Sequence, residues 1–459
     1  MIIGGLAVAY FAVMAYITYN VRRHANSSDG MTGGGRNFPA FLVGALLLSE
    51  FIGSSVSIGT AQKGYELGIS AAWNLVALAI GFLLLAFVLV RKFKETGQTT
   101  ISGILAQSYG EPVRYAASVL TIVALGIVAV ALYASGGAVL AAVLHINKSV
   151  AILAVGVTTV VYVSLGGMRS VVYTNFAHAI VKYVGVILAL AYALEATGGI
   201  GTLQAQLPGE MFNWIEIGWG QIFAWMIAGI GSIFATQYVI QAVVGTDNPA
   251  TAKRACYYVS SLMIPFGLMA ALIGMCSAVL YPGMKSIDAF PTLIAHMPAF
   301  SASVMVIGLA GALFGGISAT TLASATLAMK DFYDPFFNKD KSDRKSVLFI
   351  RIAIVVIGLL PLILALYAEK LLMIAFLGKA LRATLAVIIL MAFYAPRFGT
   401  PRGAFYGIVL SVIATIAWFL AGNPYGIDSS YLALAGPVLT MTVSQIFKRT
   451  PNADAPVSL

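Results

Sequence analysis

The stretch GALLLSEFIGSS, residues 44–55, places one glutamate, Glu50, inside an apolar run that extends from Phe38 to Ile58. Hydrophobic residues make up 60% of the 459-residue chain and charged residues only 10%, whereas soluble domains carry roughly 25% charged residues. The composition therefore predicts an all-α polytopic membrane protein. A carboxylate at bilayer depth costs about 2.5–3.5 kcal/mol on insertion scales, so a chain that keeps one is expected to use it.

Thirteen apolar stretches are long enough, at about 20 residues, to cross a bilayer as helices. They are 2–20, 38–59, 70–90, 115–144, 149–166, 172–196, 219–243, 256–281, 300–329, 350–368, 372–394, 403–421 and 430–446. The loops between them are short, so we expect one membrane domain over 1–459 with no soluble appendage. The N-terminus MIIGGLAVAY lacks a basic region and a cleavage site, and it is predicted to remain as the first helix. Cys256 and Cys276 fall about 30 Å apart on one predicted helix, too far to form a disulfide.

The net charge of +10 follows a membrane topology rather than a nucleic-acid surface. Of 27 Lys and Arg residues, 20 fall in predicted inner loops, Arg36 and Arg449 among them. The four in outer loops are Lys63, Lys148, Lys285 and Lys370, and the three within spans are Lys182, Lys379 and Arg382. This bias predicts a multi-pass protein of a bacterial-type plasma (inner) membrane, with its N-terminus outside and its C-terminus inside. The expected partners are the lipid bilayer and a small-molecule substrate, with no nucleic acid and no protein partner implied. The longest charged loop, 330–346, indicates a solvated inner connector or a docking surface.

Two spans are rich in small residues: AGIGSIFATQY at 228–238 and GLAGALFGGISATTLASATLA at 308–328. Small residues let helices approach closely, and a helix broken at glycine frees backbone carbonyls that can coordinate a cation. Ordinary close packing is the alternative explanation for each glycine alone. Discontinuous helices near the midplane are the expected binding-site device of secondary transporters.

Five segments, in the right order along the chain, resemble the sodium:solute symporter family, which includes bacterial proline, pantothenate, galactose and sialic acid carriers. They are SEFIGSSVSIGTAQKGYELGIS (49–70), YVSLGGMRSVVYTNFAHAIV (162–181), QYVIQAVVGTDNPATAKRA (237–255), LAMKDFYDP (327–335) and LGKALRATLAVIILMAFYAPRFGTPRGAFYGIVL (377–410). The resemblance implies a leucine-transporter-type fold with two inverted five-helix repeats, 38–196 and 219–394. Residues 1–37 and the two helices of 403–446 then lie at the periphery. Substrate is expected beside the broken first helix of each repeat, in contact with Ser49, Glu50, Ser54, Ser232 and Phe234.

The same resemblance places the family's sodium ligands on the carbonyls of Val43, Leu46 and Ala312. Its two hydroxyl positions fall on Gly315 and Gly316, which have no hydroxyl. Na⁺ is a hard cation that takes oxygen ligands, so a site without these groups is expected to bind it poorly.

Three neighbouring polar residues bear on the same site. The family's supporting aspartate on the fifth core helix aligns with Asn175, which removes a negative charge. Ser318 and Thr320 lie within a turn of the two glycines and either replace the lost ligands or bond back to the preceding turn.

Lys182 lies seven residues after Asn175, hence on the same helix face. Its ammonium could occupy the emptied cation site and exchange a proton, as proton-coupled carriers of this fold are thought to do; the alternative is a fixed ion pair with Glu50. His178, four residues before Lys182, is either a proton relay or satisfied by a helix neighbour. Glu50 itself grips a cationic part of the substrate, carries the coupling proton, or pairs structurally.

Lys379 and Arg382 lie three residues apart at the start of the tenth core helix. Two interpretations remain open: attraction of an anionic substrate through the outer vestibule, or extension of both side chains to the outer interface.

The residues favour a secondary active transporter that imports a small polar solute by alternating access. No cofactor is implied, and the coupling ion is Na⁺ by family or H⁺ by the lost ligands. An ion-independent facilitator and a transporter-derived sensor are the alternatives. The sequence offers no metal cluster, nucleophile pair or phosphate loop, which argues against an enzyme, and no carbonyl filter of a channel. A zwitterion, a small carboxylate and a sugar all remain open as substrate.

Overall fold

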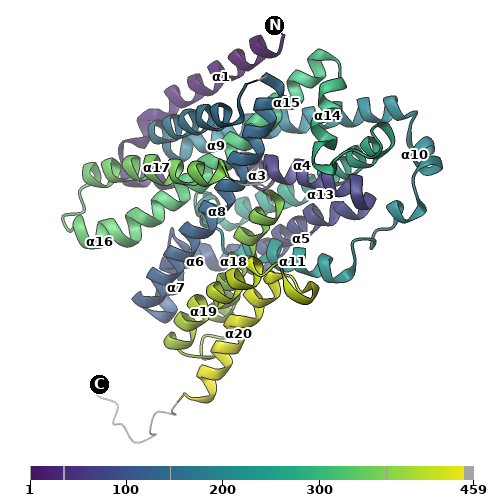
Figure 1. Ribbon diagram of the computed structural model, residues 1–459. Coiled ribbons are helices and arrows are strands. Elements are labelled where there is room, and N and C mark those ends of the chain that lie inside the picture. The colour runs from purple at the N-terminus through teal and green to yellow at the C-terminus, as the bar shows by residue number, and fades with distance from the viewer. Residues whose placement is uncertain (1, 35–36, 145, 368–370, 449–459) are drawn as a thin grey trace, which may run out of the picture.

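The computed structural model describes residues 2–34, 37–144, 146–367 and 371–448, and these residues form helices and turns with no β-strand among them (Figure 1). Arg36, Lys370 and Arg449, three of the cations counted above, lie outside the described residues. The helices are α1 (Ile2–Val21), α2 (Ser28–Gly33), α3 (Ala40–Phe51), α4 (Ser54–Leu67), α5 (Trp73–Val88), α6 (Val90–Glu95), α7 (Ile101–Tyr109), α8 (Glu111–Leu144), α9 (Lys148–Thr197), α10 (Ile200–Gln206), α11 (Trp219–Phe234), α12 (Gln237–Val244), α13 (Pro249–Leu280), α14 (Ala289–His296), α15 (Ala299–Leu327), α16 (Asp334–Phe337), α17 (Asp343–Ala365), α18 (Leu371–Tyr394), α19 (Pro401–Leu420) and α20 (Ser429–Ile446).

Each predicted span overlaps helical chain; the spans 38–59 and 219–243 each cover two helices, α3 with α4 and α11 with α12. By length and composition, eight helical segments of the described chain can cross a membrane, and the bent pair α11–α12 makes a ninth. That count treats α4 with α5 as one segment and α9 as one segment, and it leaves out α1 and α20. The number of thirteen crossings therefore stays a prediction.

The 50 residues of α9 contain one break, at Gly167, where φ is 55° and ψ is −155°. A straight helix of this length would measure about 75 Å, more than twice the roughly 30 Å of hydrocarbon in a bilayer. Gly167 fits the break because a Cβ there would lie 2.8 Å from the sulfur of Met31, and because its φ is accessible chiefly to glycine. The break supports the predicted division of this segment into two spans.

Two membrane helices are interrupted, as predicted for the helices that hold Glu50 and Ser232. Between α3 and α4, residues 52 and 53 leave the helical conformation, with Gly53 extended at φ −69° and ψ 170°. Between α11 and α12, Thr236 is extended at φ −97° and ψ 125°, and the two helices are bent by 48°. The prediction of discontinuous helices at these positions is confirmed.

A row of glycines on α15 brings this helix against the second half of α9. A Cβ on Gly308 would lie 2.8 Å from the Cα of Lys182, and one on Gly311 would lie 3.0 Å from Nδ1 of His178. A Cβ at 308 would overlap the backbone of α9, so only glycine permits this packing there, and a Cβ at 311 would be in unusually tight contact with His178. At this contact His178 and Lys182 of α9 are buried inside the protein.

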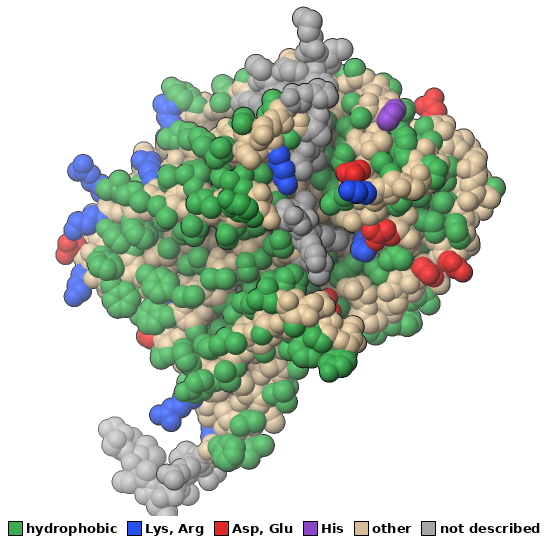
Figure 2. Space-filling view, in the orientation of Figure 1, with side chains coloured by type: hydrophobic (Ala, Val, Ile, Leu, Met, Phe, Trp, Pro, Cys, Tyr) green, Lys and Arg blue, Asp and Glu red, His purple; other side chains and the backbone are tan. Residues whose placement is uncertain are grey.

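The outer surface of the described helices is apolar where lipid is expected. Figure 2 shows hydrophobic side chains across the middle of one face, with basic groups concentrated at the left edge and acidic groups mostly toward the right. On α9, Val157 and Val161 are each 52% exposed, and on α17 Val356 is 60% exposed. These exposed aliphatic side chains suit contact with acyl chains.

Candidate substrate and ion site

The end of α3 is held by the ammonium group of Lys182, which reaches it from α9. Nζ donates hydrogen bonds to the carbonyl oxygens of Ser49, at 2.8 Å, and Ile52, at 2.7 Å. A third contact, at 3.4 Å, joins Nζ to the hydroxyl of Ser49. Helix termini leave carbonyls without intrahelical partners, and a buried carbonyl requires a donor. The ammonium thus occupies the break in the way a bound cation would.

Glu50 points into the protein, since only 6% of its surface is exposed. Neither carboxylate oxygen is in hydrogen-bond geometry with a partner among the described residues, and no ion pair with Lys182 is formed, although the carboxylate interacts with the side chain of Asn175. Glu50 nevertheless interacts electrostatically with Lys182 and with the phenol groups of Tyr162 and Tyr238. A buried carboxylate without a fixed partner is available to a substrate or a proton.

The two glycines at the predicted hydroxyl positions of the sodium site lie against other side chains. A Cβ on Gly315 would lie 2.2 Å from Oδ1 of Asn175 and 3.1 Å from the hydroxyl of Ser49. A Cβ on Gly316 would lie 2.7 Å from the side chain of Leu132. A Cβ on Gly53 would also lie 2.7 Å from that side chain. Asn175 and Leu132 therefore take the space next to the break in which the two hydroxyls of the resemblance would lie.

The predicted carbonyl ligands Val43 and Leu46 lie within α3, before the break. Carbonyls at such positions are engaged in the helix, so the free acceptors are those of Ser49 and Ile52. The role of Val43 and Leu46 as sodium ligands stays a prediction. Ala312 is fully buried on α15, one turn before Gly315.

The hydroxyls near the two glycines bond backward along α15. Ser318 donates to the carbonyl of Gly315 at 2.6 Å, and Thr320 donates to that of Gly316 at 2.8 Å. This is the second of the two predicted arrangements, and it makes Ser318 a poor replacement for a sodium ligand.

His178 is bound by the peripheral helix α1. Its Nδ1 makes a short hydrogen bond with the hydroxyl of Tyr10, and its Nε2 has no partner among the described residues. Asn175, one turn earlier, donates from Nδ2 to the carbonyl of Val171 at 2.9 Å. Of the three polar residues of α9 predicted to share a face, Asn175 and His178 have side chains that lie against α15, whereas the side chain of Lys182 reaches the end of α3.

The second break carries a cation as well. Arg382 of α18 is 1% exposed, and its Nη1 donates a short hydrogen bond to the hydroxyl of Thr236, the residue at the break. Its Nε donates to the carbonyl of Gly378 at 3.0 Å. Tyr238, in the first turn of α12, also interacts with the guanidinium.

Lys379 lies one turn before Arg382 and is 5% exposed. Its Nζ has no hydrogen-bond partner among the described residues and lies 4.7 Å from the ring centroid of Phe376. The predicted extension of Lys379 and Arg382 to the outer interface is therefore wrong, because both side chains turn inward. Burial inside the bundle, which the sequence spacing does not reveal, accounts for the difference.

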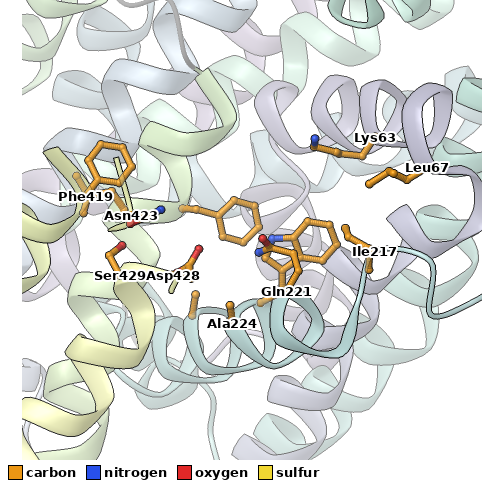
Figure 3. Close-up of a pocket in the computed structure, with 13 residues that line it drawn as sticks. Lys63, Leu67, Ile217, Gln221, Ala224, Phe419, Asn423, Asp428 and Ser429 are labelled. Carbon is orange, nitrogen blue, oxygen red and sulfur yellow. The ribbon is translucent and has the colours of Figure 1, made fainter. Parts of the chain in front are cut away.

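A cavity of about 360 Å³ opens next to these residues, between α4, α11, α18 and the α19–α20 connection. Figure 3 shows Lys63 and Leu67 on one side of it, Phe419, Asn423 and Ser429 on the opposite side, and Gln221 and Ala224 along α11. Trp225 and Phe376 also line the cavity, and their rings stack with centroids 5.7 Å apart. Under the predicted topology this cavity faces outside.

The remaining predicted substrate contacts lie close to the breaks but bond within the protein. Ser54 shares a hydrogen bond of 2.8 Å with Ser135 of α8, and Ser232 donates to the carbonyl of Gly229 at 2.8 Å. Phe234 is buried at 4% exposure in the last turn of α11. Their role as substrate contacts remains a prediction.

Sequence reasoning missed Leu132, Thr236 and Tyr238, which lie at the two breaks, and Tyr10, which binds His178. Thr236 and Tyr238 lie inside the segment that resembles the family, and the break signal of 228–238 already included them. Tyr10 and Leu132 carried no signal, because each reaches the site from a helix that looks like an ordinary apolar span.

Two broken helices that meet around buried ionisable groups, in an all-α membrane protein, define a secondary transporter of the leucine-transporter fold. The model of the sodium:solute symporter family matches residues 32–411, well over half of the chain, and the chain belongs to this family. It is therefore a transporter and not an enzyme.

Relatives and solved structures agree with this assignment. The high-affinity proline transporter PutP of Bacillus subtilis (strain 168) is 23% identical over 463 residues, which cover 96% of each chain. A Na⁺-coupled sialic acid symporter in a substrate-bound outward-open state superposes with a TM-score of 0.83, at 18% identity over 98% of each chain. Mhp1, a nucleobase-cation-symport-1 family transporter in a closed conformation with bromovinylhydantoin bound, gives a TM-score of 0.60 at 13% identity, over 91% of this chain and 94% of that one. The predicted fold and family are confirmed.

Proposed function

We propose that this protein is a proton-coupled importer of a small polar solute in which the ammonium of Lys182 takes the place of the sodium ion. The observation that supports this most directly is the pair of hydrogen bonds from Nζ to the carbonyls of Ser49 and Ile52, at 2.8 and 2.7 Å. A charged lysine offers three donors and satisfies the same oxygens that a cation would coordinate. A sodium ion at the same carbonyls would be repelled by the ammonium.

Proton coupling is proposed because the loss of one proton from Lys182 would weaken its hydrogen bonds at the end of α3. The ammonium of Lys182 holds α3 against α9, whereas the neutral amine bonds two carbonyls much more weakly. Glu50, next in sequence to Ser49, interacts with Lys182 and has no fixed partner of its own, so it is the group to exchange that proton with. Binding and release of one proton would then alternately fasten and free the broken helix.

The same contacts support a second function, in which Lys182 stays charged and the protein is an ion-independent facilitator. In that case the ammonium is a permanent replacement for sodium, and the solute moves only down its own gradient. For either function, basic side chains that gather at one end of the molecule support the inner position of that end (Figure 2).

A pH gradient is expected to drive uptake in proteoliposomes. The solute is first chosen by thermal-shift screening of the purified protein against amino acids, organic acids and sugars, since ligand stabilisation follows affinity. One pH unit, acid outside, corresponds to about 1.4 kcal/mol per proton and hence about tenfold accumulation. Replacement of sodium by potassium should change the uptake rate less than about twofold, because the cation position is filled.

Strong dependence on sodium would refute the proton mechanism. Uptake that equilibrates without accumulation, with or without a pH gradient, would instead establish the facilitator.

The Glu50→Gln variant is expected to lose pH-driven accumulation while it keeps its fold. Glutamine preserves the size of the side chain but cannot carry a proton, and no hydrogen bond to the carboxylate is lost among the described residues. The melting temperature should fall, because the buried ammonium of Lys182 loses the opposing charge of Glu50. The hydrogen bonds of Lys182 to Ser49 and Ile52 remain, and the variant should still fold. Size-exclusion chromatography and thermal unfolding would be measured beside uptake.

The matched control is Glu66→Gln on α4, where the carboxylate is partly exposed and pairs with Lys63 at 2.6 Å. This variant should transport as the natural protein does. Normal accumulation by Glu50→Gln would show that Glu50 is structural.

A further inference from the structure

The buried charges of the described residues are unbalanced. They comprise the acids Glu50 and Asp331 and the cations Lys182, Lys379 and Arg382. Asp331 lies in the helical turn Ala328–Tyr333 that follows α15, where it accepts a short hydrogen bond from Ser102 and lies 4.0 Å from Nε of Arg114. After Glu50 is set against Lys182, Lys379 and Arg382 remain without an acidic partner. Because buried charge without a counter-charge is strongly unfavourable, this pair indicates a binding site for an anion.

The second break supplies further positive potential to the same place. Thr236 ends the gap, and the N-terminus of α12, which carries a partial positive charge, begins directly after it. The guanidinium of Arg382 has five N–H donors. One binds Gly378, one binds Thr236 and Tyr238 provides a further contact, which leaves donors for an external acceptor.

Lys379, one helical turn before Arg382, has an ammonium group that makes no hydrogen bond within the described residues. Its Nζ is buried. The ammonium lies over the ring of Phe376, three residues away, at 4.7 Å from the ring centroid. Phe376 also lines the outer cavity. Phe376 stacks on Trp225, both residues line the cavity, and Lys379 does not line it. A solute in the cavity therefore reaches the ammonium once this aromatic pair parts.

We propose that Lys379 and Arg382 bind the carboxylate of a small organic acid, which passes from the outer cavity between Trp225 and Phe376 to the break at Thr236. The inference rests on the proposed transport function and specifies its substrate class. A guanidinium and an ammonium one helical turn apart give a carboxylate both a planar fork and a point charge. Under the predicted division into repeats, α9 and α18 are equivalent final helices. Each then places a cation at a break: Lys182 occupies the first, and Arg382 with Lys379 leaves the second open to an anion.

Matched acids and amides test the proposal on the full-length protein purified in detergent. The probes are lactate against lactamide and succinate against succinamide, with alanine and galactose as zwitterionic and neutral solutes. At least one of the two carboxylates is expected to raise the melting temperature by several degrees at millimolar concentration, while its amide leaves it unchanged. In Lys379→Met the shift should disappear or need at least tenfold more ligand, although the ligand-free melting temperature stays equal or rises.

Two further variants make the result decisive. Lys379→Gln retains a polar side chain and serves if the methionine variant does not fold. Arg91→Gln removes a cation that is exposed and paired with Glu95, and it should keep the full shift. Equal stabilisation by acid and amide, no stabilisation by either carboxylate, or an undiminished carboxylate shift in the folded Lys379 variants would overturn the proposal.

Failure of this inference is distinguishable from failure of the proton mechanism. A neutral solute that binds and accumulates with the pH gradient would overturn the anion site and leave proton coupling intact. A carboxylate that binds through Lys379 but accumulates only with sodium would do the reverse.

Discussion

Uptake by Lys182→Met is expected to fall about 100-fold or more and to lose its dependence on a pH gradient. The substitution removes two charge-assisted hydrogen bonds, to Ser49 and Ile52, of about 1.5–3 kcal/mol each. It also removes the group proposed to bind the proton. A loss of about 2.7 kcal/mol corresponds to a factor of about 100, and the measurement is initial uptake in proteoliposomes at several external pH values.

The main risk in that experiment is a general loss of structure, since two buried carbonyls lose their donor at a cost of about 1–3 kcal/mol each. Lys182→Gln guards against it, because an amide still donates to the carbonyls but does not titrate near neutral pH. Lys345→Met is the control for removal of a cation as such, because that side chain is 53% exposed in the first turn of α17. Uptake by a folded Lys182→Gln that still follows the pH gradient would rule out lysine as the coupling group.

Sodium dependence is expected to appear when the family's ligands are rebuilt around the break. The variant combines Gly315→Ser, Gly316→Ser, Asn175→Asp and Lys182→Ala. It supplies two hydroxyls and a carboxylate and removes the ammonium that would repel Na⁺. Uptake should then rise about tenfold or more when sodium replaces potassium, which corresponds to about 1.4 kcal/mol of ion binding coupled to transport.

Single substitutions in this set serve as controls. Gly315→Ser alone should destabilise the protein by about 1–3 kcal/mol, because its Cβ would lie 2.2 Å from Oδ1 of Asn175. The two serines with Lys182 retained should leave uptake insensitive to sodium. A rebuilt variant that folds and transports yet ignores sodium would mean that the ion site differs from the one implied by the resemblance.

Much of the fold is predictable from the sequence because lipid contact imposes a hydropathy that is easy to recognise. The limits of that signal are visible at α4, which runs on to Leu67 although the predicted span ends at 59. This part, with Thr60, Gln62 and Lys63, is too polar for lipid. It is helical because it packs against α13, where a Cβ on Gly64 would lie 2.4 Å from the carbonyl of Ala271. Burial by protein, unlike burial in lipid, leaves little trace in hydropathy.

The site was predictable where one residue alone carries the chemistry, and less so where geometry decides. Lys182 and Glu50 stand out because charge is rare inside membrane spans. The residue at which α3 ends, and therefore which carbonyls become free, depends on packing around Gly53 and could not be counted from a motif. The inward turn of Lys379 and Arg382 likewise depends on neighbouring helices, since spacing on α18 alone fits both a buried and an interfacial position.

The tight seam between α9 and α15 restricts how this carrier can change shape. Gly308 packs directly on the backbone of Lys182, with no space for even a methyl group between them. The two helices therefore have no room to slide or roll against each other. The two helices must therefore move as one rigid body. The conformational change of the transport cycle is then confined to the short half-helices α4 and α12. A larger side chain at this contact, even in Gly308→Ala, should therefore block the transport cycle although it contacts neither solute nor ion.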